Sequence, residues 1–245
     1  MEQTQPLSSE FTRFPFLTGE EFAEACHHLD RRYCQATLGP IRRKWKLRVC
    51  SALNMSFALG PEYSTYIQII RALDGELNDG DLSSHLGRLS FGSGGKESGL
   101  MDIDADREMM AAEEADEAVL PRKPRVNSGH VTYEIHLHPT YQAPCLWFSL
   151  HDLPVDEQAF NIDTVFRRLV PDQYKDGLRS AGAIGGISAD HHPVTGIPSF
   201  FIHPCLLGEA MSKFDCSKET YLMVWLGLVG ACVSLWVPAE MALGS

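Results

Sequence analysis

Residues 130–150 read HVTYEIHLHPTYQAPCLWFSL, and this stretch decides the fold. In its first half, the apolar side chains of Val131, Tyr133 and Ile135 alternate with polar ones, which is the pattern of a β-strand with one buried face. The second half, residues 143–150, is apolar and aromatic and predicts another strand. Because the link between the two is short, we expect an antiparallel hairpin.

Other segments predict the elements around this hairpin. Apolar spacing and Gly or Pro boundaries predict strands at residues 45–53, 63–73 and 199–203, a short Ile-rich strand beside Gly185 and Gly186, a turn at Gly60-Pro61, and helices at residues 22–33, 161–171 and 220–228. Thr18 and Asn161 are placed to cap two of these helices. The set predicts an α+β fold in which an antiparallel sheet of about four strands carries helices packed on it.

The acidic residues are concentrated in one segment. The chain of 245 residues has a formal net charge of -11, and the part from Glu76 to Leu120 contains twelve acidic and three basic residues. Residues 75–128 are rich in Gly, Ser, Asp and Glu and poor in aromatic residues, which predicts a disordered insertion. We therefore expect a single domain over residues 1–245, interrupted by this acidic segment. The carboxylate excess argues against a nucleic-acid-binding surface.

The cysteines predict reduced thiols. There are seven, an odd number, at irregular spacing and without a Cys-x-x-Cys pair, which fits neither a disulfide framework nor a zinc site. The first thirty residues include Glu10, Glu20 and Glu21 and have no unbroken apolar run. We therefore expect no secretory signal and a cytoplasmic protein.

Several histidines occur in pairs, so a metal site has to be considered. The candidates are the adjacent pairs His27-His28 and His191-His192, and His136 with His138 on one face of the predicted hairpin. None of these pairs has the spacing of a zinc finger or of a zincin motif. We predict surface or hydrogen-bonded imidazoles rather than metal ligands.

Cys205 differs from the other cysteines in its context. It follows the predicted strand at residues 199–203 and Pro204, and the residues after it are able to start a helix. Backbone N–H groups at a helix start favour the thiolate form of a cysteine, which is the nucleophilic form. On this pattern alone, a buried structural cysteine remains the alternative. Cys26, Cys145 and Cys232 lie in apolar patterns and are predicted to be core residues.

The apolar run from Tyr221 to Val237 is long enough to consider a membrane span. Gly227 and Gly230 divide the run, and no basic cluster follows it to set an orientation. We predict a core helix at residues 220–228, a glycine turn and a buried segment at residues 233–237. A membrane-anchored, non-enzymatic adaptor is the alternative that this run leaves open.

Three segments together carry a resemblance. Residues 191–205, HHPVTGIPSFFIHPC, are similar to the active-site segment of the autophagy-related protein 10 family, in which an aromatic strand ends in His-Pro-Cys. The sequence YEIH at residues 133–136, followed by YQAP at residues 141–144, resembles the central hairpin of that family. Residues 225–238 resemble its C-terminal helix and the segment after it. The long acidic insertion would make this chain a fungal-like variant.

The resemblance implies a fold and an activity. The fold would be that of ubiquitin-conjugating enzymes, and Cys205 would carry a ubiquitin-like modifier as a glycyl thioester. The activity would need no metal and no organic cofactor. The implied partners are the activating enzyme (autophagy-related protein 7), the modifier (autophagy-related protein 12) and the protein whose lysine accepts it (autophagy-related protein 5). Recruitment from the cytoplasm to the preautophagosomal structure would follow. His203 is a candidate for a supporting role beside Cys205, and a structural role in its loop is the alternative.

The sister family, autophagy-related protein 3, transfers its modifier to a phospholipid and also has His-Pro-Cys. Its hairpin continues with Thr-Pro-Arg where this chain has Ala143-Pro144-Cys145, so the sequence favours the protein-directed enzyme. A cysteine hydrolase would need a histidine base and an orienting Asn or Asp beside Cys205, and no such partner is identifiable from the sequence. We also expect the hairpin at residues 130–150 to offer an edge strand to the acceptor.

Overall fold

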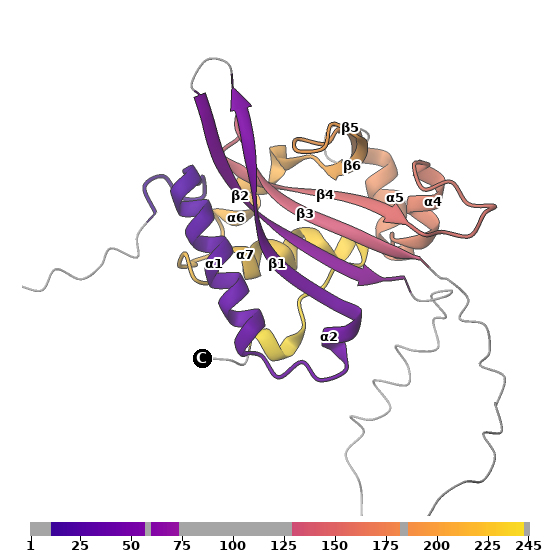
Figure 1. Ribbon diagram of the computed structural model, residues 1–245, viewed down its shortest axis with the longest axis horizontal. Coiled ribbons are helices and arrows are strands. Elements are labelled where there is room, and N and C mark those ends of the chain that lie inside the picture. The colour runs from indigo at the N-terminus through magenta and orange to yellow at the C-terminus, as the bar shows by residue number, and fades with distance from the viewer. Residues whose placement is uncertain (1–10, 57–59, 74–128, 182–185, 243–245) are drawn as a thin grey trace, which may run out of the picture. The chain divides into compact units, whose positions relative to one another are not determined.

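The computed structural model describes residues 11–56, 60–73, 129–181 and 186–242 (Figure 1). The acidic insertion predicted at residues 75–128 lies outside these residues. The described residues build one six-stranded antiparallel sheet in the order β1-β2-β3-β4-β6-β5. Its strands are β1 (Trp45–Ser56), β2 (Gly60–Ala72), β3 (His130–His138), β4 (Ala143–His151), β5 (Ile187–His191) and β6 (Pro198–Ile202).

Two expectations about the sheet are corrected. It has six strands rather than about four, because the two long N-terminal strands and the short β5 all join the sheet of the central hairpin. Gly60 and Pro61 do not form the turn between β1 and β2, since they open β2 and pair with Ser56 and Met55. Proline is tolerated there because it stands near the start of its strand, where a donor is least needed.

The hairpin of β3 and β4 is confirmed, with a register that pairs Tyr133 with Phe148 and Ile135 with Leu146. It lies in the middle of the sheet, between β2 and β6, and not at an edge. The prediction that it offers an edge strand to a partner is therefore wrong. Among the described strands, the edges are β1 and β5.

The helices begin and end at local signals. They are α1 (Gly19–Gln35), α2 (Ile41–Lys44), α4 (Ile162–Arg168), α5 (Asp172–Ala181), α6 (Leu207–Met211) and α7 (Tyr221–Val229), with 3-10 turns η1 (Pro204–Leu206), η2 (Gly230–Val233) and η3 (Ala239–Met241). Thr18 and Glu21 form a capping box at the start of α1, and Asn161 caps α4, as the sequence predicts. The sequence did not predict α5, in which no residue is fully buried and in which Tyr174 and Leu178 are the partly buried residues that pack against the core.

The core lies where helices cover one face of the sheet. Helix α1 packs on β1 and β2 and also contacts α7 (Figure 1). Tyr133, in the middle of β3, is fully buried, and its hydroxyl donates a 2.6 Å hydrogen bond to the carbonyl of Val233. This bond joins the central strand to the segment that follows α7.

The C-terminal apolar run is a core element. Trp225 and Leu226 of α7 are fully buried, which confirms the predicted core helix. The chain then turns so tightly that a Cβ atom on Gly230 would lie 2.0 Å from the carbonyl oxygen of Leu235. Trp236 is 54% exposed, so the buried segment predicted at residues 233–237 is correct only in part. Within the described ranges, no helix has the length and apolar character needed to cross a bilayer.

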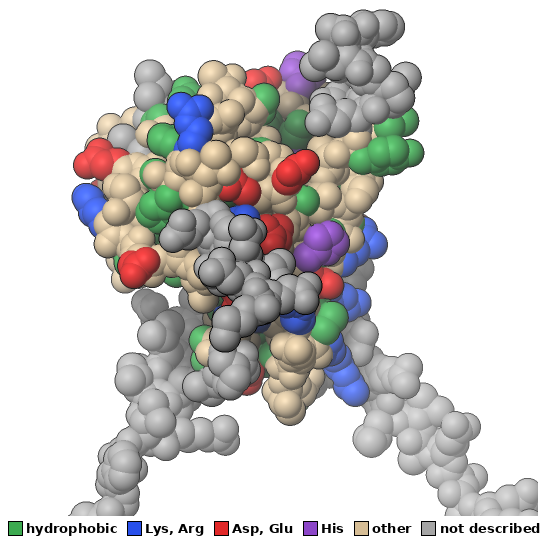
Figure 2. Space-filling model, turned by 90° about the vertical axis from the view of Figure 1, so that its left-hand side faces the viewer, with side chains coloured by type: hydrophobic (Ala, Val, Ile, Leu, Met, Phe, Trp, Pro, Cys, Tyr) green, Lys and Arg blue, Asp and Glu red, His purple; other side chains and the backbone are tan. Residues whose placement is uncertain are grey.

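Charges on the described surface are mixed. On the face shown in Figure 2, both acidic and basic side chains are present, and most of the basic ones lie along one side. This agrees with the sequence, in which most of the acidic excess falls between Glu76 and Leu120.

Candidate active site

Cys205 lies where β6 gives way to helix. The strand ends at Ile202, and His203 leads into the 3-10 turn η1, in which Pro204 is buried and Cys205 is half-buried. The backbone N–H of Cys205 donates a 3.2 Å hydrogen bond to Nδ1 of His203. Helix α6 begins two residues later, at Leu207. The predicted order of strand, Pro-Cys and helix is therefore confirmed.

Two residues from the turn between β3 and β4 lie next to His203. The ring of Tyr141 stands edge-on to that of His203, with 5.3 Å between the centroids, and the ring of His138 lies 4.8 Å from Tyr141. Nδ1 of His138 accepts hydrogen bonds from the backbone N–H groups of Thr140 and Tyr141, which fixes the turn. Burial lowers the pKa of His138, and the nearby His203 lowers it further. His138 and Tyr141 therefore pack beside the turn that carries the cysteine.

Four of the other cysteines, Cys26, Cys145, Cys216 and Cys232, have environments that suppress reactivity. Cys26 and Cys145 are buried, and burial raises the pKa of both thiols, that of Cys145 to about 12. Burial also raises the pKa of Cys232 to about 11 and, together with Asp215, raises that of Cys216. The Cys145 thiol donates a hydrogen bond to the Ile202 carbonyl at 3.4 Å, so it supports the strand that leads to Cys205. The prediction that Cys26 and Cys145 are core residues is confirmed, whereas Cys232 is only partly buried.

The surroundings of Cys205 do not form a hydrolase triad. Nδ1 of His203 is taken by the Cys205 backbone N–H, and the other contacts of this ring are aromatic. Within the described part of the chain, no carboxylate or amide side chain orients His203. A cysteine hydrolase needs a histidine held by such a group as its general base. The described residues around His203 do not supply that group.

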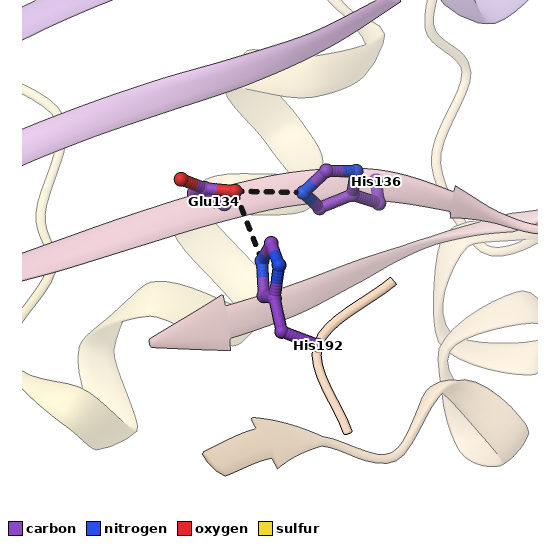
Figure 3. Close-up of side chains that lie close together, drawn as sticks. All are labelled: Glu134, His136 and His192. Carbon is purple, nitrogen blue, oxygen red and sulfur yellow. Dashed lines mark hydrogen bonds and ion pairs between the residues drawn. The ribbon is translucent and has the colours of Figure 1, made fainter. Parts of the chain in front are cut away.

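A second cluster of chemically active side chains lies on the sheet face opposite the helices (Figure 3). Nε2 of His136 and Nε2 of His192 each lie 2.9 Å from Oε2 of Glu134. Oε1 of Glu134 accepts a 2.7 Å hydrogen bond from Gln68. Burial raises the pKa of Glu134, but the hydrogen bonds that it accepts outweigh burial and hold its pKa well below the ordinary value. The carboxylate is therefore ionised.

The structure separates the histidine pairs that the sequence suggested. His192 is buried in the Glu134 cluster, while the neighbouring His191 is exposed, and His138 belongs to the turn beside His203. His28 contacts Arg31 on the surface of α1. The prediction of surface or hydrogen-bonded imidazoles is confirmed for these residues. Sequence reasoning missed Glu134, because nothing in a single strand shows that a loop far along the chain will fold over it.

Glu134, His136 and His192 are also the residues that could hold a metal ion. Their potential ligand atoms all lie within 4.8 Å of one another. Two histidines and one carboxylate suit zinc or another divalent transition metal in chemical type. Whether both imidazoles can offer a lone pair depends on their tautomers.

Comparisons with known proteins place this geometry in context. A family model described as "Autophagocytosis associated protein, active-site domain" matches residues 21–240. A protein of Gibberella zeae, described as "Ubiquitin-like-conjugating enzyme ATG10", is 60% identical over 231 residues, which are 94% of this chain and 97% of that protein. A human protein with the same description is 29% identical over 120 residues, which are 46% of this chain and 53% of the human protein. The family match includes the central hairpin and Cys205.

Proposed function

The chain belongs to the autophagocytosis-associated protein family and is a ubiquitin-like-conjugating enzyme, and from this premise we propose that Cys205 carries the modifier as a thioester. The position of Cys205 in the fold supports this assignment. It is half-buried in the turn that ends β6, whereas Cys26 and Cys145 are buried with raised pKa values. It is also the cysteine whose backbone is held by the histidine of the His-Pro-Cys sequence.

A cysteine is suited to both halves of this reaction. In the first half, the Cys205 thiolate attacks the thioester that joins the modifier to the activating enzyme, so a new S–C bond forms and the thiol of the activating enzyme leaves. In the second half, a lysine amine attacks the same carbonyl carbon. The amide forms, the Cys205 sulfur leaves as thiolate, and the amine gives up a proton. A serine would form an ester, and an alkoxide is a much poorer leaving group than a thiolate.

We further propose the partners. The modifier is autophagy-related protein 12, the activating enzyme is autophagy-related protein 7, and the acceptor is a lysine of autophagy-related protein 5, in the cytoplasm and at the preautophagosomal structure. The 60% identity to the Gibberella zeae enzyme supports this assignment. Ala143 and Pro144, which precede the buried Cys145, stand where the lipid-directed sister family has Thr-Pro-Arg.

Charging by the activating enzyme tests the assignment of Cys205. Purified activating enzyme, modifier and ATP are mixed with the wild-type protein, and the adduct is resolved on a gel with and without reductant. We expect a reductant-sensitive adduct that Cys205→Ala abolishes and that Cys205→Ser replaces with a slower, reductant-resistant ester. Cys216→Ala is the matched control, because Cys216 is also partly buried, and it should charge like the wild type. An adduct of wild-type amount on Cys205→Ala contradicts the proposal.

The acceptor is tested in a second step. Charged enzyme is separated from ATP and the activating enzyme and is then offered either the folded protein acceptor or liposomes that contain phosphatidylethanolamine. We expect discharge onto a lysine of the protein and little transfer to the lipid. Efficient transfer to liposomes with none to the protein would assign the chain to the activity of the lipid-directed sister.

A further inference from the structure

The cluster of Glu134, His136 and His192 lies outside the proposed thioester site but joins the strand that carries it. His192 follows β5 directly, and its backbone N–H donates to the carbonyl of Ile197, so it begins the tight turn into β6. Its side chain reaches back over the sheet and is 7% exposed. Figure 3 shows the imidazole pointing from this loop toward the carboxylate on β3. The residue therefore connects the turn at residues 193–196 to the centre of the sheet.

Hydrogen bonds fix the tautomer of His192. Its Nδ1 accepts the backbone N–H groups of Val194 and Thr195, both at 3.3 Å. A backbone N–H can only donate, so Nδ1 carries no proton and the ring proton of the neutral imidazole is on Nε2. Nε2–H therefore donates to Oε2 of Glu134. The two nitrogens therefore have different roles. Nδ1 accepts hydrogen bonds from the turn at residues 193–196, and Nε2–H bonds this turn to Glu134 on the sheet.

The same tautomer argues against a metal ion in this cluster. To bind a metal through Nε2, His192 would have to move its proton to Nδ1, where it would face the two backbone N–H donors of Val194 and Thr195. Metal-bound histidines instead donate their second ring N–H to an acceptor such as a carbonyl or a carboxylate. Glu134 already has donors for both of its oxygens, so the cluster is complete without an ion.

The strand that leads to Cys205 has little other attachment to the sheet. β6 pairs with β4 over only three residue pairs, and its other neighbour, β5, is an edge strand that pairs with β6 alone among the described strands. A short ladder leaves register and orientation weakly specified unless side chains fix them. The bond between His192 and Glu134 supplies such a constraint at the turn that joins β5 to β6.

A row of rings runs from His192 to the proposed active site. The rings of His192 and Trp147 meet edge-on at 5.5 Å, and Trp147 stacks on Phe201 at 4.7 Å with planes 27° apart. His203 comes two residues after Phe201, just beyond the end of β6, and its ring lies 6.1 Å from that of Phe201. His203 then accepts the backbone N–H of Cys205. A shift of His192 therefore reaches Cys205 through contacts between neighbouring rings.

We propose that His192, held by Glu134, is a positioning residue that sets the placement of Cys205 for thioester transfer. This inference rests on the proposed function of Cys205. His192 touches neither the modifier nor the acceptor in this scheme, and it acts through β6 and the row of rings. Its loss should lower the rate of the chemical step and leave recognition of the partners unchanged.

Two substitutions separate the two tasks of the imidazole. His192→Gln places an amide N–H near the position of Nε2 and can keep the bond to Glu134, but it loses the acceptor for the turn. His192→Asn places a carbonyl near the position of Nδ1 and can keep the turn, but it loses the bond to Glu134. His191→Gln is the matched control, because His191 is the exposed neighbour.

Charging kinetics and imidazole NMR test the inference. We expect both His192 variants to lower the kcat of charging between about tenfold and a hundredfold, since a misplacement of about 1 Å can have an effect of that size. Their KM for the loaded activating enzyme should stay within about twofold of the wild type, and His191→Gln should behave like the wild type in both constants. In the wild-type protein, nitrogen-15 NMR should show His192 as the Nε2–H tautomer at neutral pH. That measurement does not depend on activity or on whether a variant folds.

Three outcomes would overturn the inference. One is wild-type kcat in both His192 variants, another is a proton on Nδ1 of His192, and the third is stoichiometric binding of zinc that His192→Gln removes. Failure of the proposed function has a different signature, because it appears as an adduct that persists in Cys205→Ala. If Cys205→Ala abolishes the adduct while both His192 variants charge normally, only the positioning role is lost.

Discussion

Nδ1 of His203 accepts the backbone N–H of Cys205 at 3.2 Å, so the histidine of the His-Pro-Cys sequence caps the turn in which the cysteine lies. The N–H groups that open a helical turn have no partner within it, and a side-chain acceptor satisfies one of them. The same bond places the proton of a neutral His203 ring on Nε2. His203 therefore has a demonstrable local task in addition to the supporting chemical role that the sequence suggested.

Substitutions of His203 should separate these roles. Asparagine is a good cap and can replace Nδ1 as the acceptor, whereas alanine cannot. We expect His203→Ala to lower the free energy of unfolding by about 1 kcal/mol, and His203→Asn to stay close to the wild type in stability and in charging rate. Chemical denaturation and the charging assay measure the two quantities. An Asn variant that is stable but charges slowly would instead assign the decisive role to Nε2–H.

The elements that the sequence predicted well are those with local signals. Alternation of apolar and polar residues identified β3, and Thr18 and Asn161 marked the starts of α1 and α4. The strand that ends in Pro204-Cys205 was also readable, because its aromatic residues and prolines are adjacent in sequence. In each case the residues that determine the element lie within a few positions of one another, so the pattern can be recognised in one sequence.

The features that the sequence did not predict depend on tertiary contacts. Helix α5 has only two apolar side chains that pack against the core, Tyr174 and Leu178, and both are only partly buried. The central position of the hairpin follows from strand order, which pairs β4 with the distant β6. The bond from His192 to Glu134 joins β3 to a loop about 60 residues later, and no local pattern specifies such a meeting.

The Glu134 cluster predicts that stability falls on acidification. Burial lowers the pKa of His136 below its ordinary value of 6.5, although the hydrogen bond to Glu134 opposes this. The unfolded chain then takes up protons before the folded one does, so stability is full above pH 6.5 and falls as the pH drops toward the folded pKa. A second loss should begin below about pH 4.5, because the folded pKa of Glu134 lies beneath that value.

Melting temperatures measured between pH 8 and pH 4 check this prediction. His136→Gln keeps a donor for Glu134 but does not titrate, so it should flatten part of the fall between about pH 7 and pH 5. The flattening should be partial, because burial also lowers the pKa values of His138 and His151. A wild-type melting temperature that rises as the pH falls through 6 would contradict the assigned direction.

The acidic segment should be dispensable for folding. The ends of the chain on either side of it are already joined, because the N–H of Leu73 donates a 3.0 Å hydrogen bond to the carbonyl of Gly129 and Ala72 pairs with His130. A short Gly-Ser linker in place of residues 79–126 can therefore connect the two strands. Closing a shorter loop costs slightly less conformational entropy. We expect the melting temperature and the charging rate to stay close to the wild-type values.

Gly129 supplies the control for this deletion. Its φ of +76° is unfavourable for other residues, and a Cβ atom there would lie 2.6 Å from the carbonyl oxygen of His151. Gly129→Ala should therefore lower the melting temperature in both the full-length and the shortened protein. Loss of folding on deletion with Gly129 intact would show that the acidic segment is part of the core.

Helix α7 offers a test that separates a core helix from a membrane anchor. Leu226 is fully buried, and Leu228 of the same helix is 37% exposed. A buried aspartate without a partner costs several kcal/mol, against a total stability of roughly 5 to 15 kcal/mol for a domain. We expect Leu226→Asp to unfold the protein at room temperature and Leu228→Asp to melt within a few degrees of the wild type, as circular dichroism would show.

If the run from Tyr221 were instead a membrane span, both aspartates would face lipid, and both would weaken a membrane association that resists carbonate washing. Equal effects of the two substitutions would therefore remove the core assignment, whereas a large effect of Leu226→Asp alone follows from the packing of α7 under the sheet.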